Sequence, residues 1–347
     1  MKKIKVALLS YGVSGKIFHA PFIEQHPGFE LTGSWERSKQ LIQLDYPTIK
    51  SYKTIEELLA DDVDLVIVNT PIATHFEYTK QVLLAGKHAV VEKAFTTTVA
   101  EAQELKRIAE EQGVLLSVFQ NRRWDSDFKT VQNVLNRKVL GEIVEAEIHF
   151  DRYNPTLSPK QHKETKNAGA GIVMDLGSHI IDQALCLFGM PKAVFADFQI
   201  LRLHSLVEDY FEILLYYPAF RVRLKATFFA RATVPAYVIH GTKGSFLKKR
   251  GDVQEDDLKA GKKLSDHDWG VEPDSLAGFL HTEKDGVVIE QKISAIAGNY
   301  SGYYEQLYQS IANNQSLPVT VSEGIHVMQI IEAARESNAT KKVIELA

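Results

Sequence analysis

The sequence holds a single cysteine, Cys186, among 347 residues. One cysteine cannot form an internal disulfide or a cysteine-built zinc site, so the chain is neither a disulfide-stapled secreted domain nor a zinc finger. The chain also lacks a basic excess, because 40 Lys and Arg oppose 44 Asp and Glu for a net charge of −4. A protein that neutralises nucleic-acid phosphates needs such an excess. We therefore expect no nucleic-acid partner.

Long hydrophobic runs are also missing. No apolar stretch approaches the roughly 20 residues that a membrane-spanning helix needs, so we expect no membrane partner. The opening MKKIKVALLS has the basic start of a signal peptide, but its apolar part is short and a turn follows at Tyr11–Gly15. With 45% hydrophobic and 24% charged residues the composition is that of a globular protein. The expected location is the cytoplasm, and the length suggests about two domains.

The first 120 residues alternate strand and helix patterns. The expected strands are short and apolar on both faces, and one helix, Thr74–Ala85, carries a capping-box pattern at Thr74 and Glu77. The predicted strands are Ile4–Ser10, Phe29–Trp35, Leu65–Asn69, His88–Glu92 and Val114–Val118, and the other helices are Ile17–Gln25, Ile55–Ala60 and Val99–Gln112. Such strands between helices predict a parallel sheet covered on both sides, a doubly wound Rossmann domain over residues 1–122.

The pattern changes after Trp124. Helices are expected at Asp127–Asn136, Met174–Phe188 and Gly324–Ser337, and a strand at Ile143–Phe150. Between Phe220 and Phe228 apolar and polar residues alternate, which is typical of a strand with one buried face, and Tyr217–Phe220 forms its hairpin turn. The charged residues 252–272 suggest a surface loop. Residues 123–347 are thus predicted as an α+β domain with a mainly antiparallel, open sheet.

The first strand-to-helix turn resembles a dinucleotide-binding fingerprint. It keeps the second and third glycines of G-x-G-x-x-G, where the backbone approaches a pyrophosphate and the helix packs closely on the strand. Amides at the start of the following helix favour an anion. The residues predicted to bind the cofactor here are Ser10, Tyr11, Gly12, Val13, Ser14 and Gly15.

An acidic residue, Glu36, ends the second predicted strand about 20 residues after Gly15, where a carboxylate can bind the ribose hydroxyls. Arg37 and Ser38 follow it, and an Arg-Ser pair can instead hold a 2′-phosphate. Glu36 and Arg37 are both candidate cofactor contacts. The choice between NAD and NADP stays open.

The segment MDLGSHIIDQALCLF places Asp175, Ser178, His179 and Asp182 on one stripe of an otherwise apolar helix. A helix of this kind is buried, and its polar groups then need partners or a wet cavity. His179 could act as an acid or base near neutral pH with carboxylates beside it, or it could pair with an aspartate and merely lock the core. A metal site is not expected, because Asp-x-x-x-His supplies two ligands only.

Glu92 and Lys93 close another predicted parallel strand, at the edge where open α/β sheets bind ligands. Lys93 could steady developing charge on a substrate oxygen, or it could be an ordinary exposed lysine.

These residues resemble a known family. The segments SYGVSGKIFHAPFI, VNTPIATHFE, VVEKAF, NRRW and AGAGIVMDLGSHIIDQAL are similar to those of the Gfo/Idh/MocA oxidoreductases, and the likeness continues through GTKGSF and LPVTVSEG. The family name joins glucose–fructose oxidoreductase, inositol dehydrogenase and a rhizopine-catabolism protein.

The resemblance implies a Rossmann domain, then an α/β domain whose open sheet often forms a homo-oligomer interface. It implies hydride transfer between NAD(P) and a hydroxyl-bearing carbon of a sugar, polyol or inositol. Carried over residue by residue, Lys93 and His179 would be catalytic, with Asp175 orienting the substrate or tuning the imidazole. The further implied cofactor contacts are Thr70, Pro71, His75, Glu92, Lys93 and Gln120, and the implied substrate contacts are Asn121, Asp175 and His179.

Three departures from the family pattern bear on the transfer. Ser10 replaces the first fingerprint glycine, and His162-Lys-Glu164 stands where many relatives have Trp-Arg-Glu. Ala94 replaces the proline of Glu-Lys-Pro, and because a cis bond before a non-proline residue costs about 2.5–4 kcal/mol we expect the Lys93–Ala94 peptide to be trans.

The sequence therefore predicts an NAD(P)-dependent dehydrogenase or reductase acting on CH–OH groups. The alternative is a non-catalytic NAD(P)-binding regulator of the same fold, since the family includes transcriptional sensors. The presence of Lys93, Asp175 and His179 together argues against that alternative.

Overall fold

The structure, a computed structural model, describes residues 3–36, 39–159, 161–232 and 234–346. The chain divides into two compact units. The first unit comprises Met1–Asn121, Glu255–Asp266 and Tyr300–Ile325, and the second comprises Arg122–Gln254, His267–Asn299 and His326–Ala347. Two segments from the last third of the chain thus belong to the same unit as its beginning.

In the described part of the first unit, six parallel strands form one sheet in the order β3-β2-β1-β4-β5-β6. The strands are β1 (Ile4–Leu8), β2 (Phe29–Trp35), β3 (Lys50–Tyr52), β4 (Leu65–Val68), β5 (His88–Glu92) and β6 (Leu116–Phe119). Strands β1, β4 and β6 are almost entirely buried, as their apolar sequences require. The order reverses between β1 and β4, which is the switch point of a doubly wound sheet. The predicted Rossmann fold is confirmed.

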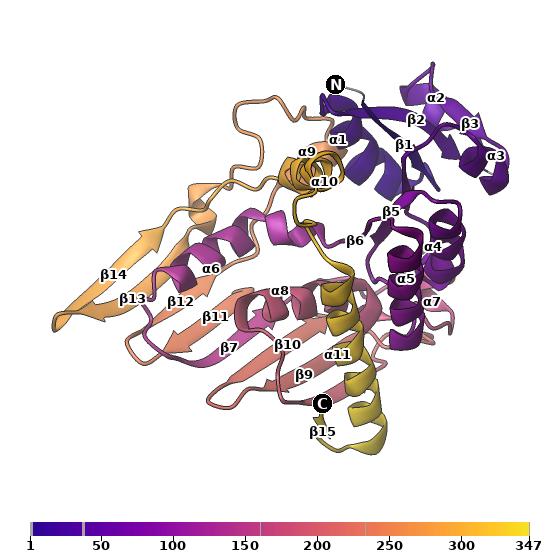
Figure 1. Ribbon diagram of the computed structural model, residues 1–347. Helices are drawn as coiled ribbons and strands as arrows, with labels where there is room; N and C mark the ends of the chain where they lie inside the picture. The colour runs from indigo at the N-terminus through magenta and orange to yellow at the C-terminus, as the bar shows by residue number, and fades with distance from the viewer. Residues whose placement is uncertain (1–2, 37–38, 160, 233, 347) are drawn as a thin grey trace. The chain divides into compact units, whose positions relative to one another are not determined.

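Helices connect these strands, and one further helix of this unit comes from residues 301–313, late in the chain (Figure 1). They are η1 (Gly15–His19), α1 (Ala20–Gln25), α2 (Ile42–Asp45), α3 (Ile55–Ala60), η2 (Ile72–Thr74), α4 (His75–Leu84), α5 (Val99–Gln112) and α10 (Ser301–Asn313). The predicted capping box at Thr74 is wrong. A 3-10 turn, η2, precedes α4, and the Thr74 hydroxyl donates to the Pro71 carbonyl at 2.7 Å. A complete capping box forms instead at the start of α5, between Thr98 and Glu101.

The second unit is built on a nine-stranded sheet, as far as its described residues go, in the order β14-β13-β12-β11-β7-β10-β9-β8-β15. The strands are β7 (Ile143–His149), β8 (Ala193–Gln199), β9 (Tyr210–Tyr216), β10 (Arg221–Thr227), β11 (Tyr237–Gly241), β12 (Gly244–Lys248), β13 (Gly278–Lys284), β14 (Val287–Ile293) and β15 (Ile344–Glu345). Strands β7 and β10 pair in parallel, whereas the other described pairs are antiparallel. The predicted α+β domain with a mainly antiparallel sheet is confirmed.

The remaining helices are η3 (Asn121–Trp124), α6 (Ser126–Asn136), α7 (Gln161–Glu164), η4 (Val173–Gly177), α8 (Ser178–Phe188), α9 (Gln254–Lys259), η5 (Asp274–Leu276) and α11 (Val321–Thr340). The sequence predicted residues 252–272 as an irregular loop, and α9 shows that this prediction is partly wrong. The run Gln254–Lys259 gains an i,i+4 ion pair between Glu255 and Lys259, which favours a helical turn.

The sheet of the second unit has two different faces. On one face Val222, Leu224 and Ala226 of β10 are fully buried, and α8 packs over β10 and β7 (Figure 1). On the other face Arg223 pairs with Glu147 of β7 and Glu212 of β9. Opposite charges on neighbouring strands neutralise one another there. The predicted two-faced strand is confirmed.

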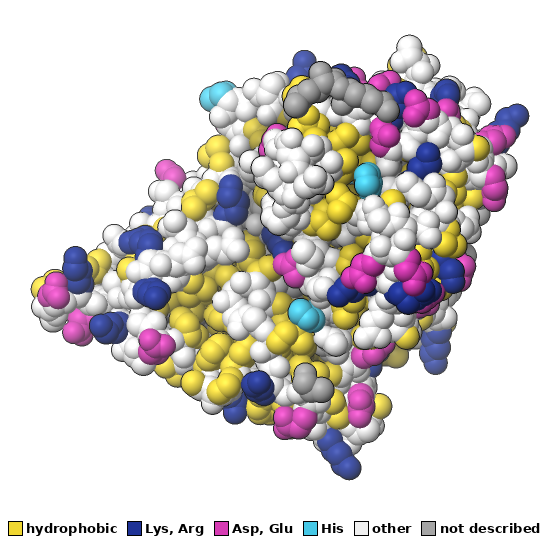
Figure 2. Space-filling view, viewed as in Figure 1, with side chains coloured by type: hydrophobic (Ala, Val, Ile, Leu, Met, Phe, Trp, Pro, Cys, Tyr) yellow, Lys and Arg dark blue, Asp and Glu magenta, His cyan; other side chains and the backbone are white. Residues whose placement is uncertain are grey.

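Figure 2 shows acidic, basic and hydrophobic side chains interspersed over the visible face of the molecule. Within the described ranges, none of the helices has the length and apolar content needed to cross a membrane.

Candidate active site

The predicted phosphate-binding turn of the first unit, residues 10–15, is shaped by contacts with Asn69. The Asn69 side-chain amide donates to the carbonyl oxygen of Ser10 at 2.7 Å. A Cβ atom on Gly15 would lie 2.3 Å from that same carbonyl oxygen, so a side chain there would force the backbone to move. The nearest neighbour of a Cβ on Gly12 is the Ser10 hydroxyl, at 3.5 Å. Gly15 is therefore required by packing within the chain, whereas Gly12 has room beside it.

The other residues of the turn differ in what they offer a cofactor. The Ser10 hydroxyl, in place of the first fingerprint glycine, accepts a hydrogen bond from the Gly12 amide at 3.2 Å. Tyr11 is buried and its hydroxyl donates to Asp45 at 2.9 Å, and burial raises the pKa of Tyr11 above its usual value. Val13 is 53% exposed. The turn thus presents backbone amides rather than long polar side chains, as an anion-binding turn does.

Two buried acceptors fit a dinucleotide. The Oδ1 atom of Asn69, just after β4, and the Oε1 atom of Gln120, just after β6, have no hydrogen-bond partner among the described residues. Both side chains are more than nine-tenths buried. A buried acceptor needs a donor, and the amide and ribose hydroxyls of a nicotinamide dinucleotide carry donors. Gln120 was predicted from the sequence; Asn69 was not, although its place directly after a buried strand is the feature that could have identified it.

His75 is fully buried at the start of α4. Its Nδ1 atom lies 2.9 Å from the Ala94 carbonyl oxygen, and its Nε2 atom lies 2.9 Å from that of Thr70. Burial lowers the pKa of His75 below its usual value, against the opposing effect of these hydrogen bonds. The ring therefore lies between the loop at Thr70 and the exposed Pro71 on one side and the segment after β5 on the other.

The peptide bond between Lys93 and Ala94 is cis. The expectation of a trans bond is therefore wrong. That expectation considered only the intrinsic trans preference of a bond before a non-proline residue. In the fold, the Ala94 carbonyl lies within hydrogen-bond distance of His75, and the side chains of Ala94 and Phe95 are buried.

Glu92 ends β5 and is bound within the chain rather than left open to a ligand. Its Oε1 atom accepts a hydrogen bond from the Ser14 hydroxyl and lies 3.0 Å from Nε2 of His19. Burial raises the pKa of Glu92, but His19 and Ser14 lower it more, so the net pKa lies below its usual value. Glu92 is ionised and links the phosphate-binding turn to the residue before Lys93.

Glu36 also has partners in its own chain. One carboxylate oxygen accepts from the Leu41 amide at 2.9 Å and the other from the Ile42 amide at 3.1 Å, at the start of α2. These contacts take up part of the acceptor capacity that ribose hydroxyls would use. Arg37 and Ser38 lie outside the described residues.

In the second unit, Asp175 lies in the π-helical turn η4 and His179 in the first turn of α8. His179 is 4% exposed, and its ring centroid lies 6.3 Å from that of Phe150. The Asp175 carboxylate accepts from Nζ of Lys163 at 2.8 Å, in an ion pair whose side chains are 30% and 41% exposed. A carboxylate held by a cation and a buried imidazole therefore lie one turn apart on one helical segment.

Lys163 belongs to the segment in which this chain departs from the Trp-Arg-Glu of many relatives. The next residue, Glu164, forms a buried ion pair with Arg202 at 2.9 Å, and Arg202 also binds Asp209 at 2.9 Å. This triad fixes α7, and with it the backbone from which Lys163 reaches Asp175. No pattern in the sequence identified Lys163 as a partner of Asp175.

The other members of the predicted stripe have structural partners. Asp182 binds Arg123 through two hydrogen bonds of 2.8 and 2.6 Å. The Ser178 hydroxyl donates to the Met174 carbonyl at 2.8 Å. The prediction that the helix is buried is confirmed for its first half, where Ile180 and Ile181 are fully buried.

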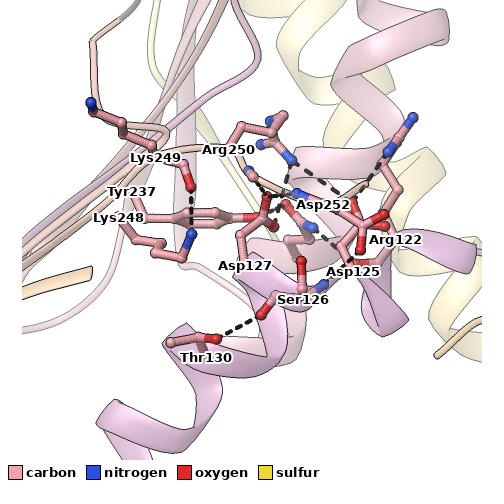
Figure 3. A network of polar contacts seen from close by, with 12 residues as sticks. Arg122, Asp125, Ser126, Asp127, Thr130, Tyr237, Lys248, Lys249, Arg250 and Asp252 are labelled. Carbon is pink, nitrogen blue, oxygen red and sulfur yellow. Dashed lines mark hydrogen bonds and ion pairs between the residues drawn. The ribbon is translucent and has the colours of Figure 1, made fainter. Parts of the chain in front are cut away.

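A network of buried charges supports the segment after η3 (Figure 3). Arg122 binds Asp125 at 3.2 Å, and Arg250 lies 4.0 Å from both Asp125 and Asp127. Burial, with Asp252 adding to it, raises the pKa of Asp125 well above its usual value. Gln183 of α8 donates to the Arg122 carbonyl at 3.1 Å, so the network also holds the helix that carries His179. Among the described residues no group of three His, Cys, Asp or Glu side chains is placed to hold a metal ion.

Comparison with known proteins identifies the family of each part of the chain. Residues 4–120 match the Gfo/Idh/MocA family profile described as an oxidoreductase family NAD-binding Rossmann fold. Residues 133–346 match the profile described as the C-terminal alpha/beta domain of that oxidoreductase family.

Similar proteins extend over the whole chain. The scyllo-inositol 2-dehydrogenase (NADP(+)) IolW of Bacillus subtilis is 39% identical over 99% of this chain and 96% of its own length. The oxidoreductase YdgJ of Escherichia coli is 39% identical over 99% of both chains. The solved structure of the oxidoreductase yvaA from Bacillus subtilis superposes with a TM-score of 0.95, at 39% identity, over 100% of this chain and 99% of that chain. The chain belongs to the Gfo/Idh/MocA family and is an NAD(P)-dependent oxidoreductase.

Proposed function

We propose that the protein catalyses reversible hydride transfer between NAD(P) and a hydroxyl-bearing carbon of an inositol, another polyol or a sugar. The observation that carries the proposal is the Asp175–His179 pair, a cation-held carboxylate one turn before a buried imidazole. The similarity to a scyllo-inositol dehydrogenase over nearly the full chain supports the substrate class.

Each residue has a role that its chemistry allows. When bound, NAD(P) supplies the hydride acceptor or donor. In the oxidising direction His179 accepts the hydroxyl proton on its imidazole. The Lys93 ammonium donates a hydrogen bond to the same oxygen and stabilises the negative charge that grows on it. Asp175, held by Lys163, orients the substrate hydroxyl.

Further cofactor and substrate contacts follow from the same proposal. The amides of Val13 to Gly15 would bind the pyrophosphate, while the Gly12 backbone comes close to it. Gln120, whose Oε1 atom is buried without a partner among the described residues, would accept from the cofactor, and Asn121 would contact the substrate.

We also propose that NADP is the preferred cofactor. Both carboxylate oxygens of Glu36 already accept backbone hydrogen bonds, so its capacity to bind a free 2′-hydroxyl is reduced. IolW, which is similar over 99% of this chain, is an NADP(+) enzyme by name.

The test is an absorbance assay of purified protein with NADP+ or NAD+ and a panel of scyllo-inositol, myo-inositol, other polyols and sugars. His179→Ala should lower turnover by about 10²- to 10⁴-fold, which is the usual contribution of a positioned acid or base. His267, 98% exposed in the same unit, gives the matched control, and His267→Ala should retain turnover. Full turnover by His179→Ala, or tight NADPH binding without turnover on the whole panel, would count against the proposal.

We further propose a cytoplasmic homo-oligomer that assembles through the outer face of the second unit's sheet. Alternation along β9 and β10 leaves Tyr210, Leu214 and Tyr216 half-buried on that face beside neutralised charges, which suits contact with a second copy. Light scattering of the purified protein measures the subunit number.

A further inference from the structure

The Glu92 carboxylate occupies a junction within the first unit. Glu92 is the last residue of β5 and directly precedes Lys93. Its Oε1 atom accepts from the hydroxyl of Ser14, which lies in the phosphate-binding turn. The same oxygen lies 3.0 Å from Nε2 of His19, whose side chain is 0% exposed. His19 thus contacts the carboxylate that joins the phosphate-binding turn to the end of β5, although His19 itself is a predicted ligand contact in neither segment.

The hydrogen-bond partners of His19 bear on its charge. Its Nδ1 atom lies 2.8 Å from the Tyr304 hydroxyl oxygen. That hydroxyl has one proton, which it donates to the Phe18 carbonyl, so the Tyr304 oxygen accepts from Nδ1–H. The ionised Glu92 accepts from Nε2–H. With acceptors facing both ring nitrogens, the arrangement favours an imidazolium.

The surroundings suit a buried cation. The Phe119 ring flanks His19 with its centroid 4.5 Å away, close enough for its electrons to attract the positive charge. The residues that contact the ring come from three different segments, namely β5, β6 and α10. Such convergence holds the imidazolium in one place.

The charge of His19 matters because the pyrophosphate of the dinucleotide is proposed to bind beside Ser14, which shares the Glu92 carboxylate with His19. A buried carboxylate without a counter-ion is strongly unfavourable, and a net negative charge beside Ser14 would repel a pyrophosphate. We propose that His19 is a positioning residue for the dinucleotide: its cation neutralises Glu92 and, through the shared carboxylate, holds the Ser14 turn and the strand end that carries Lys93. The inference rests on the proposed function, since it takes residues 10–15 as the phosphate-binding turn.

Two substitutions separate the two nitrogens of the ring. The amide nitrogen of His19→Gln reaches about as far as Nε2 and keeps a donor on Glu92. The amide nitrogen of His19→Asn reaches only as far as Nδ1, so it keeps the Tyr304 contact and leaves Glu92 unpaired. Fluorescence titration with NADPH and NADH measures binding without any substrate. We expect His19→Asn to weaken NADPH binding roughly tenfold or more. His19→Gln keeps a donor on Glu92 but not the positive charge, so it should weaken binding by an intermediate amount.

A rescue experiment distinguishes charge from packing. Adding Glu92→Gln to His19→Asn removes the unpaired carboxylate and should recover binding, even if the protein unfolds at lower urea concentration than the wild type. The proposal is overturned if His19→Asn binds NADPH as tightly as the wild type, if Asn and Gln weaken binding equally, or if Glu92→Gln gives no recovery. A wild-type protein that binds neither NADPH nor NADH would instead refute the proposed function, and this inference with it.

Discussion

The two glycines of the phosphate-binding turn should respond oppositely to the same substitution. In Gly15→Ala the new Cβ would lie 2.3 Å from the Ser10 carbonyl oxygen and 3.0 Å from Nδ2 of Asn69. The first of these is a backbone atom, so relief requires the turn to move, and overpacking of this kind costs about 1–3 kcal/mol. In Gly12→Ala the nearest atom is 3.5 Å away, an ordinary contact, so the free energy of unfolding should change by no more than about 0.5 kcal/mol.

Gly12→Ala, which should not change the stability of the protein, should nevertheless weaken cofactor binding. At Gly12 the backbone must approach the pyrophosphate closely, so a methyl group that is harmless to the protein alone obstructs the ligand. We expect Gly12→Ala to unfold in urea like the wild type but to bind NADPH much more weakly in a fluorescence titration. Gly15→Ala should be less stable even without nucleotide. Wild-type stability of Gly15→Ala, or wild-type NADPH affinity of Gly12→Ala, would refute this assignment of the two glycines.

Two further predictions concern the second unit. Lys248 and Glu272 form a fully buried ion pair at 2.6 Å. Lys248→Met should therefore lower the free energy of unfolding, measured in urea, by about 3–5 kcal/mol, and a double variant lacking both charges should recover part of the loss. Equal stability of Lys248→Met and the wild type would contradict this. Burial lowers the pKa of His149, but hydrogen bonds to Asp151 and Glu147 raise it more, so its pKa lies above the usual value. The stability that protonated His149 contributes is present below its unfolded pKa and is lost as the pH rises through the folded pKa, so His149→Gln should destabilise the protein more at about pH 5.5 than at about pH 9.

Much of the first unit could be predicted from the sequence because its information is local. The strands Phe29–Trp35 and His88–Glu92 and the helices Ile55–Ala60 and Val99–Gln112 have the predicted bounds. The helix Val99–Gln112 has residues at both ends that favour a helix start and a helix end. Thr98 and Glu101 cap its start, and Gly113 ends it in the left-handed conformation with φ of 65°. Apolar periodicity and capping act within a few residues, so a sequence pattern can record them.

The contribution of α10 to the first unit could not be predicted in this way. The Tyr303 hydroxyl lies 2.9 Å from that of Ser117 in β6, and the Tyr304 hydroxyl lies 2.8 Å from His19. These contacts join residues that are 186 and 285 positions apart in the sequence, and hydrophobic periodicity carries no information about pairs so far apart. The failed capping box at Thr74 has a local cause instead, because a 3-10 turn precedes the helix and the Thr74 hydroxyl donates to the Pro71 carbonyl.

The candidate site shows a more specific limit, which concerns charged side chains. The sequence predicts that Glu36, Glu92 and Asp175 carry chemistry, and the argument that a partly buried carboxylate needs a partner is sound. It does not say which partner. Glu36 accepts amides of its own loop, Glu92 faces His19, and Asp175 faces Lys163.

These partners change what each carboxylate can do. A carboxylate bound to a histidinium positions its neighbours instead of binding ligand hydroxyls, whereas one paired with a half-exposed lysine can still exchange that partner for a substrate. Asp175 is of the second kind, since Lys163 is 41% exposed. Polar groups of a substrate could therefore divide between Lys163 and Asp175. The segment that departs from Trp-Arg-Glu thus supplies, in Lys163, the cation that faces Asp175 in this chain, and a substrate that binds Asp175 as proposed must compete with that cation.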